Sequence, residues 1–276
     1  MLQFKVDDGR CVRCGACVRD CPAGIIEQAG RALPRILPEN EEHCLQCQHC
    51  LAVCPKGAVS ILGRDPDRSA GLGPESFPGL DAMSLLVRGR RSARQYRAEA
   101  VDPALVASLL DTLAHAPTGV NHRGLTFHVI DDVATMQRLR ERLQAGLLEA
   151  AVAGRLAERF AYLARVVEFG QKSGRDVVLR GAPHALIVSA SPEAPCGYED
   201  VILSLATFDL LAQTAGLGTV WCGLLAASLA ALPEVAASLG LPPGHRFYGM
   251  LFGWPAVRYA RTVQRSDAAA VRRPRL

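Results

Sequence analysis

The chain has 276 residues, of which 49% are hydrophobic and 21% are charged, and its formal net charge is +4. This composition matches globular proteins and excludes disorder, collagen and coiled coil, while so small a charge does not indicate nucleic-acid binding. The length exceeds the roughly 150 residues of a typical domain, so we expect one large domain or two unequal ones.

The sequence predicts a soluble, cytoplasmic protein. Its first eight residues, MLQFKVDD, lack the apolar region and small-residue cleavage site of a signal peptide. The most apolar stretch, residues 201–241, is interrupted by Asp209, Gln213, Pro233 and Glu234, which indicates a core segment rather than a membrane span. We therefore expect neither a membrane nor a nucleic acid as a partner.

Eight of the ten cysteines fall in two short blocks, each with the pattern C-x2-C-x2-C-x3-C-P and 33 positions apart. A disulfide framework suits this crowding poorly in a chain without an export signal, and four-ligand zinc sites rarely use this spacing. The pattern is typical of bacterial [4Fe–4S] proteins, in which the fourth cysteine of each block binds the other cluster. The predicted ligands are therefore Cys11, Cys14, Cys17 and Cys54 for one cluster, and Cys44, Cys47, Cys50 and Cys21 for the other.

Residues 1–62 resemble a bacterial two-cluster ferredoxin over their whole length. Two clusters in the core explain how about 62 residues can fold. Apolar runs at residues 2–6, 23–26 and 58–62 predict strands of small hairpins. His43 and His49 flank the second block, but four cysteines already complete each ligand set.

The remainder of the chain predicts a linker and a larger domain. Residues 63–80 are rich in glycine and proline and indicate a linker. Residues 81–276 then alternate helical and strand-like patterns, which favours an α+β or α/β domain. Helices are expected at residues 104–115, 133–169 and 201–215, and strands at residues 125–131, 184–190, 218–221 and 246–252.

Four segments of this second domain are candidates for a binding site, although no nucleotide-binding glycine motif is present. Residues 216–221 end in tryptophan and follow a helix, which disfavours a Rossmann site. Taken alone, residues 88–97 form either a solvated basic segment or an anion site, and residues 116–121 form a turn. The others are residues 216–223, with small side chains, and residues 253–255, followed by Arg258, Arg261 and Arg265.

In this order, the four segments resemble the FMN-dependent nitroreductase family over residues 84–276. The resemblance implies an α+β fold with a mostly antiparallel central sheet flanked by helices, an intertwined homodimer and two FMN sites at its interface. It implies that the FMN phosphate and pyrimidine edge are bound by Arg90, Arg91, Ser92 and Arg94, with Arg265 adding to the phosphate site. The partner subunit would contribute Pro117, Thr118, Gly119 and Asn121, and an amide of Trp221, Cys222 or Gly223 would face flavin N5.

The sequence also departs from the family. Residues 122–125 read HRGL where many members have x-Q-P-W, and Thr118 replaces a serine. The bland interpretation of Cys222 is a small buried hydrophobic residue, and that of Cys196 is a loop thiol. His115, His122 and His184 are each expected to pack rather than to donate a proton, so no catalytic residue is assigned.

The whole chain therefore resembles a ferredoxin fused to a nitroreductase. We expect an iron–sulfur flavoprotein enzyme that passes low-potential electrons, from a donor such as ferredoxin, through two [4Fe–4S] clusters to FMN. FMN would then reduce a small organic acceptor such as a nitroaromatic, a quinone or an activated alkene by two electrons. Two alternatives stay open: an NAD(P)H-fed flavin reductase with the clusters as the electron exit, and a non-enzymatic relay or redox sensor.

Overall fold

The computed structural model describes residues 2–265 and 270–275, and these divide into two compact units. The first unit comprises the residues up to Pro78 together with Val120–His122. The second comprises Gly79–Gly119 and the residues from Arg123 onward. Within the predicted linker lie two short 3-10 turns, η2 (Pro66–Arg68) and η3 (Pro74–Ser76). The predicted boundaries at residues 62 and 81 stay predictions.

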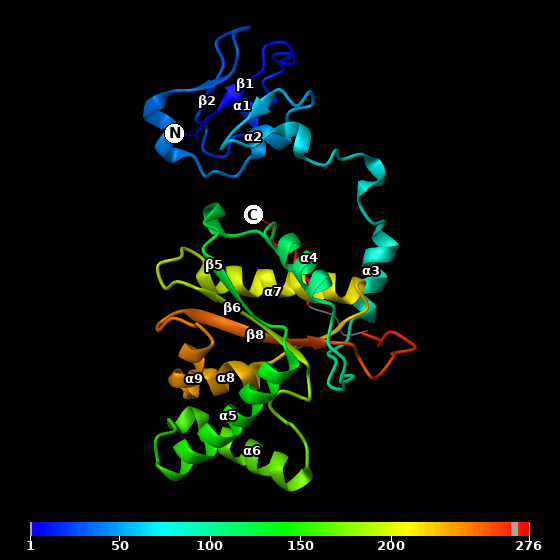
Figure 1. The fold of residues 1–276 in the computed structure, drawn as a ribbon. Helices are drawn as coiled ribbons and strands as arrows, with labels where there is room; N and C mark the ends of the chain where they lie inside the picture. The colour runs from blue at the N-terminus through cyan, green and yellow to red at the C-terminus, as the bar shows by residue number, and fades with distance from the viewer. Residues whose placement is uncertain (1, 266–269, 276) are drawn as a thin grey trace. The chain divides into compact units, whose positions relative to one another are not determined.

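The first unit is built from two-residue strands and single helical turns (Figure 1). Strand β1 pairs antiparallel with β4, and β2 pairs antiparallel with β3. The runs at residues 2–6 and 58–62 thus form strands as expected, but they pair with each other rather than in separate local hairpins. The elements are β1 (Lys5–Val6), α1 (Ala16–Arg19), β2 (Ile26–Glu27), β3 (Arg35–Ile36), η1 (Pro38–His43), α2 (His49–Ala52) and β4 (Val59–Ser60).

Two thiols belong to the core of the first unit. Cys17 and Cys50 are each 6% exposed and pack with a handful of apolar side chains, among them Leu2, Ile26 and Ile61. So small a core rarely stabilises a unit of this length without a metal or disulfides. The packing therefore suits a unit whose interior is completed by cofactors.

The repeat of 33 positions in the sequence is also a repeat of backbone conformation. Each cysteine block has two left-handed residues inside it and one after it, which bend the loop so that successive cysteines face inward. The left-handed pairs are Arg13 (φ 57°) and Gln46 (52°), Gly15 (67°) and Gln48 (60°), and Gly24 (63°) and Gly57 (57°).

The second unit is a four-stranded sheet covered by helices on both faces (Figure 1). The strand order is β5-β6-β8-β7, and every pair is antiparallel. The strands are β5 (Leu125–Ile130), β6 (His184–Ala190), β7 (Gly218–Trp221) and β8 (Arg246–Gly253). The helices are α3 (Leu80–Gly89), α4 (Pro103–Leu113), α5 (Val133–Val152), α6 (Tyr162–Ser173), α7 (Gly197–Thr214), α8 (Gly223–Ala231) and α9 (Pro233–Ser238), with 3-10 turns η4 (Gly119–Asn121) and η5 (Glu158–Phe160).

Alternation along the buried strand β6 separates two cores. Leu186 and Val188 pack with α4 and α7 on one face, whereas Ala185 and Ile187 pack with α5, α6 and α8 on the other. Because successive side chains of a strand point to opposite faces, a fully apolar central strand serves both cores. The expected α+β class with an antiparallel sheet is thereby confirmed.

Three helix predictions needed correction. The single helix expected at residues 133–169 is two helices, α5 and α6, separated by Gly154 in a left-handed conformation (φ 65°) and by η5. Helix α7 begins at Gly197 rather than at residue 201, because its polar first turn hides the start of the apolar pattern. Helices α8 and α9 were not anticipated, since the alanine-rich run gives no clear periodicity.

None of the helices that the structure describes is long and apolar enough to cross a membrane.

Candidate functional site

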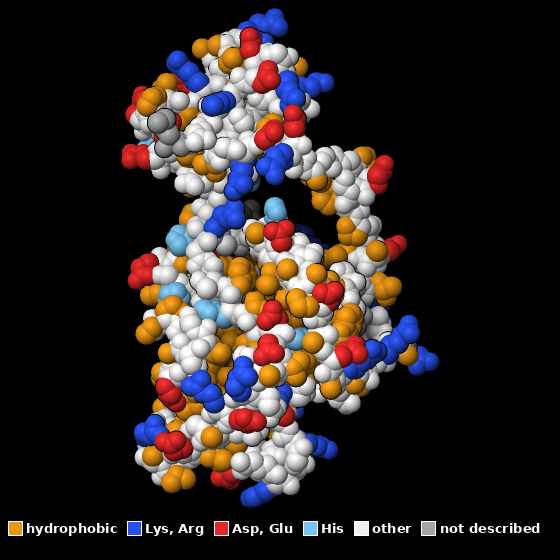
Figure 2. Space-filling view, viewed as in Figure 1, with side chains coloured by type: hydrophobic (Ala, Val, Ile, Leu, Met, Phe, Trp, Pro, Cys, Tyr) orange, Lys and Arg blue, Asp and Glu red, His pale blue; other side chains and the backbone are white. Residues whose placement is uncertain are grey.

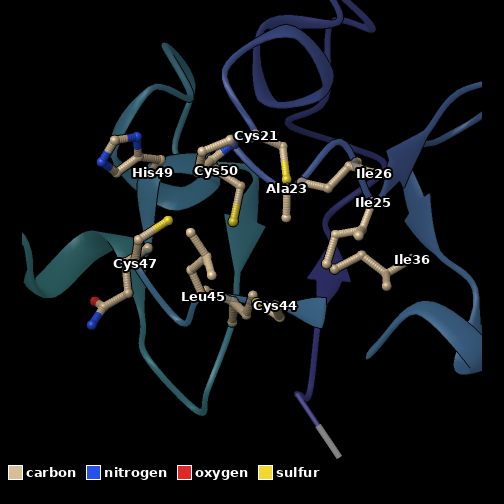
Figure 3. Close-up of a pocket in the computed structure, with 13 residues that line it drawn as sticks. Cys21, Ala23, Ile25, Ile26, Ile36, Cys44, Leu45, Cys47, His49 and Cys50 are labelled. Atoms are coloured by element: carbon tan, nitrogen blue, oxygen red, sulfur yellow. The ribbon is translucent and has the colours of Figure 1, made fainter. Parts of the chain in front are cut away.

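One cavity of the first unit is lined by four cysteines drawn from both blocks (Figure 3). It holds about 340 Å³ of empty space. The sulfurs of Cys21, Cys47 and Cys50 point into the same space, and Cys44 completes the set. Apolar side chains make up most of the remaining wall. Four thiols around one cavity fit the donor set of a [4Fe–4S] cluster. The group contains Cys21 of the first block and three cysteines of the second, as expected if the fourth cysteine of each block binds the other cluster.

Three of the other four cysteines, Cys11, Cys17 and Cys54, lie near one another. The pKa of the Cys17 thiol is raised, mainly by burial and further by the neighbouring sulfurs of Cys54 and Cys11. Cys54 of the second block therefore lies beside the first block. Cys14, the fourth predicted ligand, is exposed.

Burial makes these thiols hard to ionise without a metal. It raises the pKa of Cys50 to about 12 and also raises that of Cys44. A cysteine ligates iron as the thiolate, so binding must displace the proton. Among the described residues, no three His, Cys, Asp or Glu side chains could hold a single ion. The thiolates of a cubane cluster each bond a different iron, so they surround a cage instead.

In the second unit, the basic segment after α3 runs as an added strand beside β7. Ser92 bridges Thr219 in parallel, and the Ala93 amide donates to the Thr219 carbonyl at 2.8 Å. A Cβ at Gly218 would lie 2.6 Å from the Cβ of Ala93, so only glycine permits this approach. Further along, the Arg97 amide donates to the Trp254 carbonyl at 2.9 Å. Three of the four predicted segments thus meet at one edge of the sheet.

Strand alternation decides which of the predicted side chains share a face. Arg90, Ser92 and Arg94 are two positions apart and lie on one face of the extended segment. Arg91 and Ala93 line a separate groove, whose empty space is about 1110 Å³, together with Trp254. The structure therefore separates Arg91 from the other three residues of its segment.

A buried carboxylate on α7 connects these segments. Asp209 is 5% exposed and accepts hydrogen bonds from the Thr219 hydroxyl and from Trp221 Nε1, the latter at 3.1 Å. Arg90 Nη1 lies 3.3 Å from Asp209 Oδ2. Because this pairing neutralises Arg90, its guanidinium is a positioned partner of Asp209 rather than a free cation.

The loop at residues 116–121 is held on the start of α7. The Gly119 amide donates to Asp200 Oδ1 at 2.8 Å, and Asp200 is 2% exposed. A Cβ at Gly119 would lie 2.6 Å from Cys196 Sγ, so this position too requires glycine. Thr118 accepts from the Arg123 amide at 3.0 Å. Pro117 is exposed and Asn121 is half-buried. No contact described within the chain joins this loop to the other three segments.

A second groove beside Arg94 is strongly basic. Arg94, Arg175 and Arg180 line about 1060 Å³ of empty space. Its acidic side chain, Asp176, pairs with Arg140 at 2.6 Å and accepts backbone amides, so it does not neutralise the groove. Within the described part of the chain these three guanidiniums have no carboxylate partner, which makes the groove suited to an anion.

Cys222 is buried between this basic groove and α8. It is 6% exposed, and burial raises the pKa of its thiol to about 11. Its Sγ donates to the Val178 carbonyl at 3.2 Å and accepts from the Leu225 amide. The interpretation of Cys222 as a buried side chain is confirmed, and its backbone amide donates to the Gly249 carbonyl at 2.9 Å. Gly223 begins α8, whereas Arg265 is exposed.

Each of the two parts of the chain matches a known protein family. Residues 87–254 match the Nitroreductase family, and residues 10–58 match the 4Fe-4S dicluster domain. The chain belongs to the nitroreductase family. It is an oxidoreductase of that family with a ferredoxin-type domain at its N-terminal side, and the predicted fusion is confirmed.

Solved structures share the fold of the nitroreductase domain. A nitroreductase with bound FMN from Bacteroides fragilis is 21% identical, with a TM-score of 0.54 over 68% of this chain and 97% of that one. A nitroreductase with bound FMN from Desulfitobacterium hafniense is 21% identical, with a TM-score of 0.54 over 71% of this chain and 100% of that one. An FMN-dependent nitroreductase from Mycobacterium smegmatis in complex with NADPH is 19% identical, with a TM-score of 0.51 over 70% of this chain and 99% of that one.

Four residues of the nitroreductase domain escaped the sequence analysis. Asp200 and Asp209 occur in an apolar helix, where a carboxyl group is itself a signal that it has a buried partner. Asp209 was noted only as an interruption of an apolar stretch. Arg175 and Arg180 lie outside every motif, and only the fold brings them beside Arg94.

Serine in place of either exchanging cysteine should damage the cluster of the opposite block. We expect Cys21→Ser to alter the iron bound by Cys44, Cys47 and Cys50, and Cys54→Ser to alter the iron bound by the first block, because each removes one of four thiolates. Iron and sulfide analysis with electron paramagnetic resonance of the reduced protein measures this. Cys196→Ser, outside both blocks, is the control and should keep full iron. Equal loss from both variants with unchanged spectra would contradict the exchange.

Alanine at Asp209 should destabilise the nitroreductase domain. The change leaves the Thr219 hydroxyl and Trp221 Nε1 without their acceptor and Arg90 without its ion-pair partner, and we expect the free energy of unfolding to fall by about 1–3 kcal/mol. Trp221 and Trp254 both lie in this domain, so denaturant unfolding followed by tryptophan fluorescence reports on it directly. Asp111→Ala, an exposed carboxyl on α4, is the matched control. A change no larger than that of the control would show that Asp209 is not the anchor.

Proposed function

We propose that this protein is an iron–sulfur flavoprotein that passes low-potential electrons through two [4Fe–4S] clusters to FMN, for two-electron reduction of a small organic acceptor. The observation that carries this proposal is the cavity lined by four cysteines of both blocks, with Cys54 beside the first block, in one chain with a nitroreductase domain. The clusters carry single electrons, and bound FMN supplies the step from one-electron to two-electron chemistry.

The residues proposed to hold FMN come from the segments that meet beside β7. Ser92 and Arg94 share a face of the added strand, and Arg94 opens onto the basic groove with Arg175 and Arg180. We propose that these cationic side chains bind the phosphate and the pyrimidine edge, and that Arg90 acts mainly by ordering the segment through Asp209. The backbone of residues 221–223 would face N5. Arg265 stays a candidate for the phosphate.

A second copy of the chain is proposed to complete each flavin site. Helix α3 has no buried residue, although it carries several large apolar side chains, and its Leu80 and Leu85 are 82% and 64% exposed. Leu203 on α7 is 45% exposed. Figure 2 shows hydrophobic side chains gathered over the middle of this domain. Such surface on a monomer marks an interface. The loop at residues 116–121, which contacts no other flavin segment in its own chain, would then serve the partner's FMN.

An NAD(P)H-fed reductase, with the clusters as the electron exit, is the competing function. The relative from Mycobacterium smegmatis is described in complex with NADPH, and it lies within the same fold. Residues 216–221 still lack the spacing of a dinucleotide fingerprint. The electron donor and the direction of electron flow through the clusters therefore distinguish the two functions.

Removing one cation from the basic groove should weaken FMN binding. A charge-assisted hydrogen bond contributes about 1.5–3 kcal/mol, so we expect Arg94→Gln or Arg180→Gln to raise the dissociation constant of FMN by roughly ten-fold or more. Quenching of flavin fluorescence on titration of the apoprotein measures this. Arg155→Gln removes the same charge from an exposed pair with Glu149 and should leave the affinity unchanged. Unchanged affinity in both groove variants would move the proposed site elsewhere.

Electron entry through the clusters should appear as a kinetic difference. In anaerobic stopped-flow experiments, reduced ferredoxin should bleach the FMN absorbance of the wild type faster than NADH or NADPH does. The double variant Cys14→Ser/Cys47→Ser lacks a ligand of each cluster, and we expect its FMN to be reduced by ferredoxin slower by roughly ten-fold or more, about 1.4 kcal/mol in activation free energy.

The same variant supplies the control. It should keep FMN and its rate with dithionite, because the cores of the nitroreductase domain contain no residue of the first unit. Equal rates with ferredoxin in both proteins would exclude the clusters as the entry. Rapid bleaching by NADPH alone would instead establish the competing function.

A further inference from the structure

The two cysteine blocks are copies in backbone conformation but not in charge. Here the first cluster site means Cys11, Cys14, Cys17 and Cys54, and the second cluster site means Cys21, Cys44, Cys47 and Cys50. Within residues 11–24 and 44–57, four pairs of equivalent positions differ in formal charge. They are Arg13 and Gln46, Arg19 and Ala52, Asp20 and Val53, and Ala23 and Lys56.

All three cations belong to the first cluster site. Arg19 Nη1 donates to the Cys14 carbonyl at 2.9 Å, and Arg13 Nη1 donates to the Cys11 carbonyl at 3.2 Å. These bonds fix both guanidiniums against the loop that would wrap the cluster. Lys56 follows Cys54 by two residues.

The cations differ in how far they are neutralised. Arg13 pairs with Asp8, which offsets its charge. Arg19 is exposed and forms no ion pair among the residues that the structure describes, so solvent screens its charge but no carboxylate offsets it. Arg19 is therefore the residue with the largest expected influence on the first cluster site.

Carboxylates lie instead at the second cluster site. Asp20 directly precedes Cys21, and its Oδ2 lies 3.5 Å from His49 Nδ1, a side chain that lines the four-cysteine cavity. Glu41 is near enough to Cys44 to add to the rise in the pKa of that thiol, which burial dominates. The second cluster site thus has two carboxylates nearby, whereas the first has three cations and one carboxylate, Asp8.

We propose that this asymmetry gives the two clusters different reduction potentials, with the first cluster the more easily reduced and Arg19 the main determinant. The inference rests on the proposed function, which supplies the two clusters. Reduction of [4Fe–4S]2+ to [4Fe–4S]1+ adds one electron and no proton, so the cluster gains one negative charge. A fixed cation stabilises the reduced form more than the oxidised form, and a carboxylate does the reverse.

The consequence is an order of filling. The first electron from an external one-electron donor rests on the first cluster, and a second enters the second cluster only from a more strongly reducing donor. A chain with both clusters reduced holds the two electrons that reduction of the acceptor consumes. The charges near the cysteines thus set how reducing a donor must be to load the protein fully.

The test is a dithionite titration of the full-length protein, followed by electron paramagnetic resonance. The wild type should show two one-electron steps at different potentials. Arg19→Ala, the residue that the second block has at this place, should shift the upper step to lower potential and leave the lower step in place. Arg19→Lys keeps the charge and should stay close to the wild type.

A reciprocal variant and a control complete the design. Ala52→Arg places a guanidinium where it can reach the Cys47 carbonyl, and it should shift the lower step to higher potential. Arg31→Ala removes the same charge from the turn between β2 and β3 and should move neither step. Iron and sulfide content of each variant verifies that its clusters are intact.

The outcomes separate the two proposals. Two intact clusters whose potentials do not respond to Arg19→Ala, or a shift of the lower step instead of the upper, would overturn this inference alone. A wild type with far fewer than about eight iron atoms per chain would overturn the proposed two-cluster function and this inference with it.

Discussion

The exchange of the last cysteine between two blocks is the constraint on which the first unit depends. Cys21 of the first block lines one cavity with Cys44, Cys47 and Cys50 of the second, so the second block does not complete this group by local folding. The strand pairing follows the same rule, because β1 pairs with β4 across the length of the unit. Two thiols lie in its small core, so metal binding at the proposed sites would be coupled to the folding of this unit.

The nitroreductase domain is organised by buried carboxylates instead of by thiols. Asp209 holds Arg90, Thr219 and Trp221 together, and Asp200 holds the loop at Gly119, from positions nine residues apart on α7. Both are nearly inaccessible, and a buried carboxylate is stable only with such partners. Helix α7 thereby fixes the segments proposed to surround a flavin while its apolar face belongs to the core. The same two carboxylates, Asp200 and Asp209, therefore both position these segments and contribute to the stability of the domain.

Electrostatics separates the roles of arginines that look alike in the sequence. Arg90 forms an ion pair with Asp209, and Arg91 lines a different groove. Arg94 lines the basic groove together with Arg175 and Arg180, two residues that no sequence motif contains. In the ferredoxin-type domain, Arg13 is offset by Asp8, whereas Arg19 is not. A basic run therefore reports how much charge is present, and only the partners of each guanidinium decide where an anion or a reduced cluster is stabilised.

The sequence by itself determined the chemistry of the cofactors and the order of the two domains. Thiol spacing within a loop is a local property, and so are the apolar runs that predicted β6 and β7 within a residue. The break between α5 and α6, the pairing of β1 with β4, and the partners of Asp200, Asp209, Arg175 and Arg180 were decided only by the tertiary structure. Those features join residues far apart in the chain, and their free energy arises from burial and charge pairing that no local pattern records.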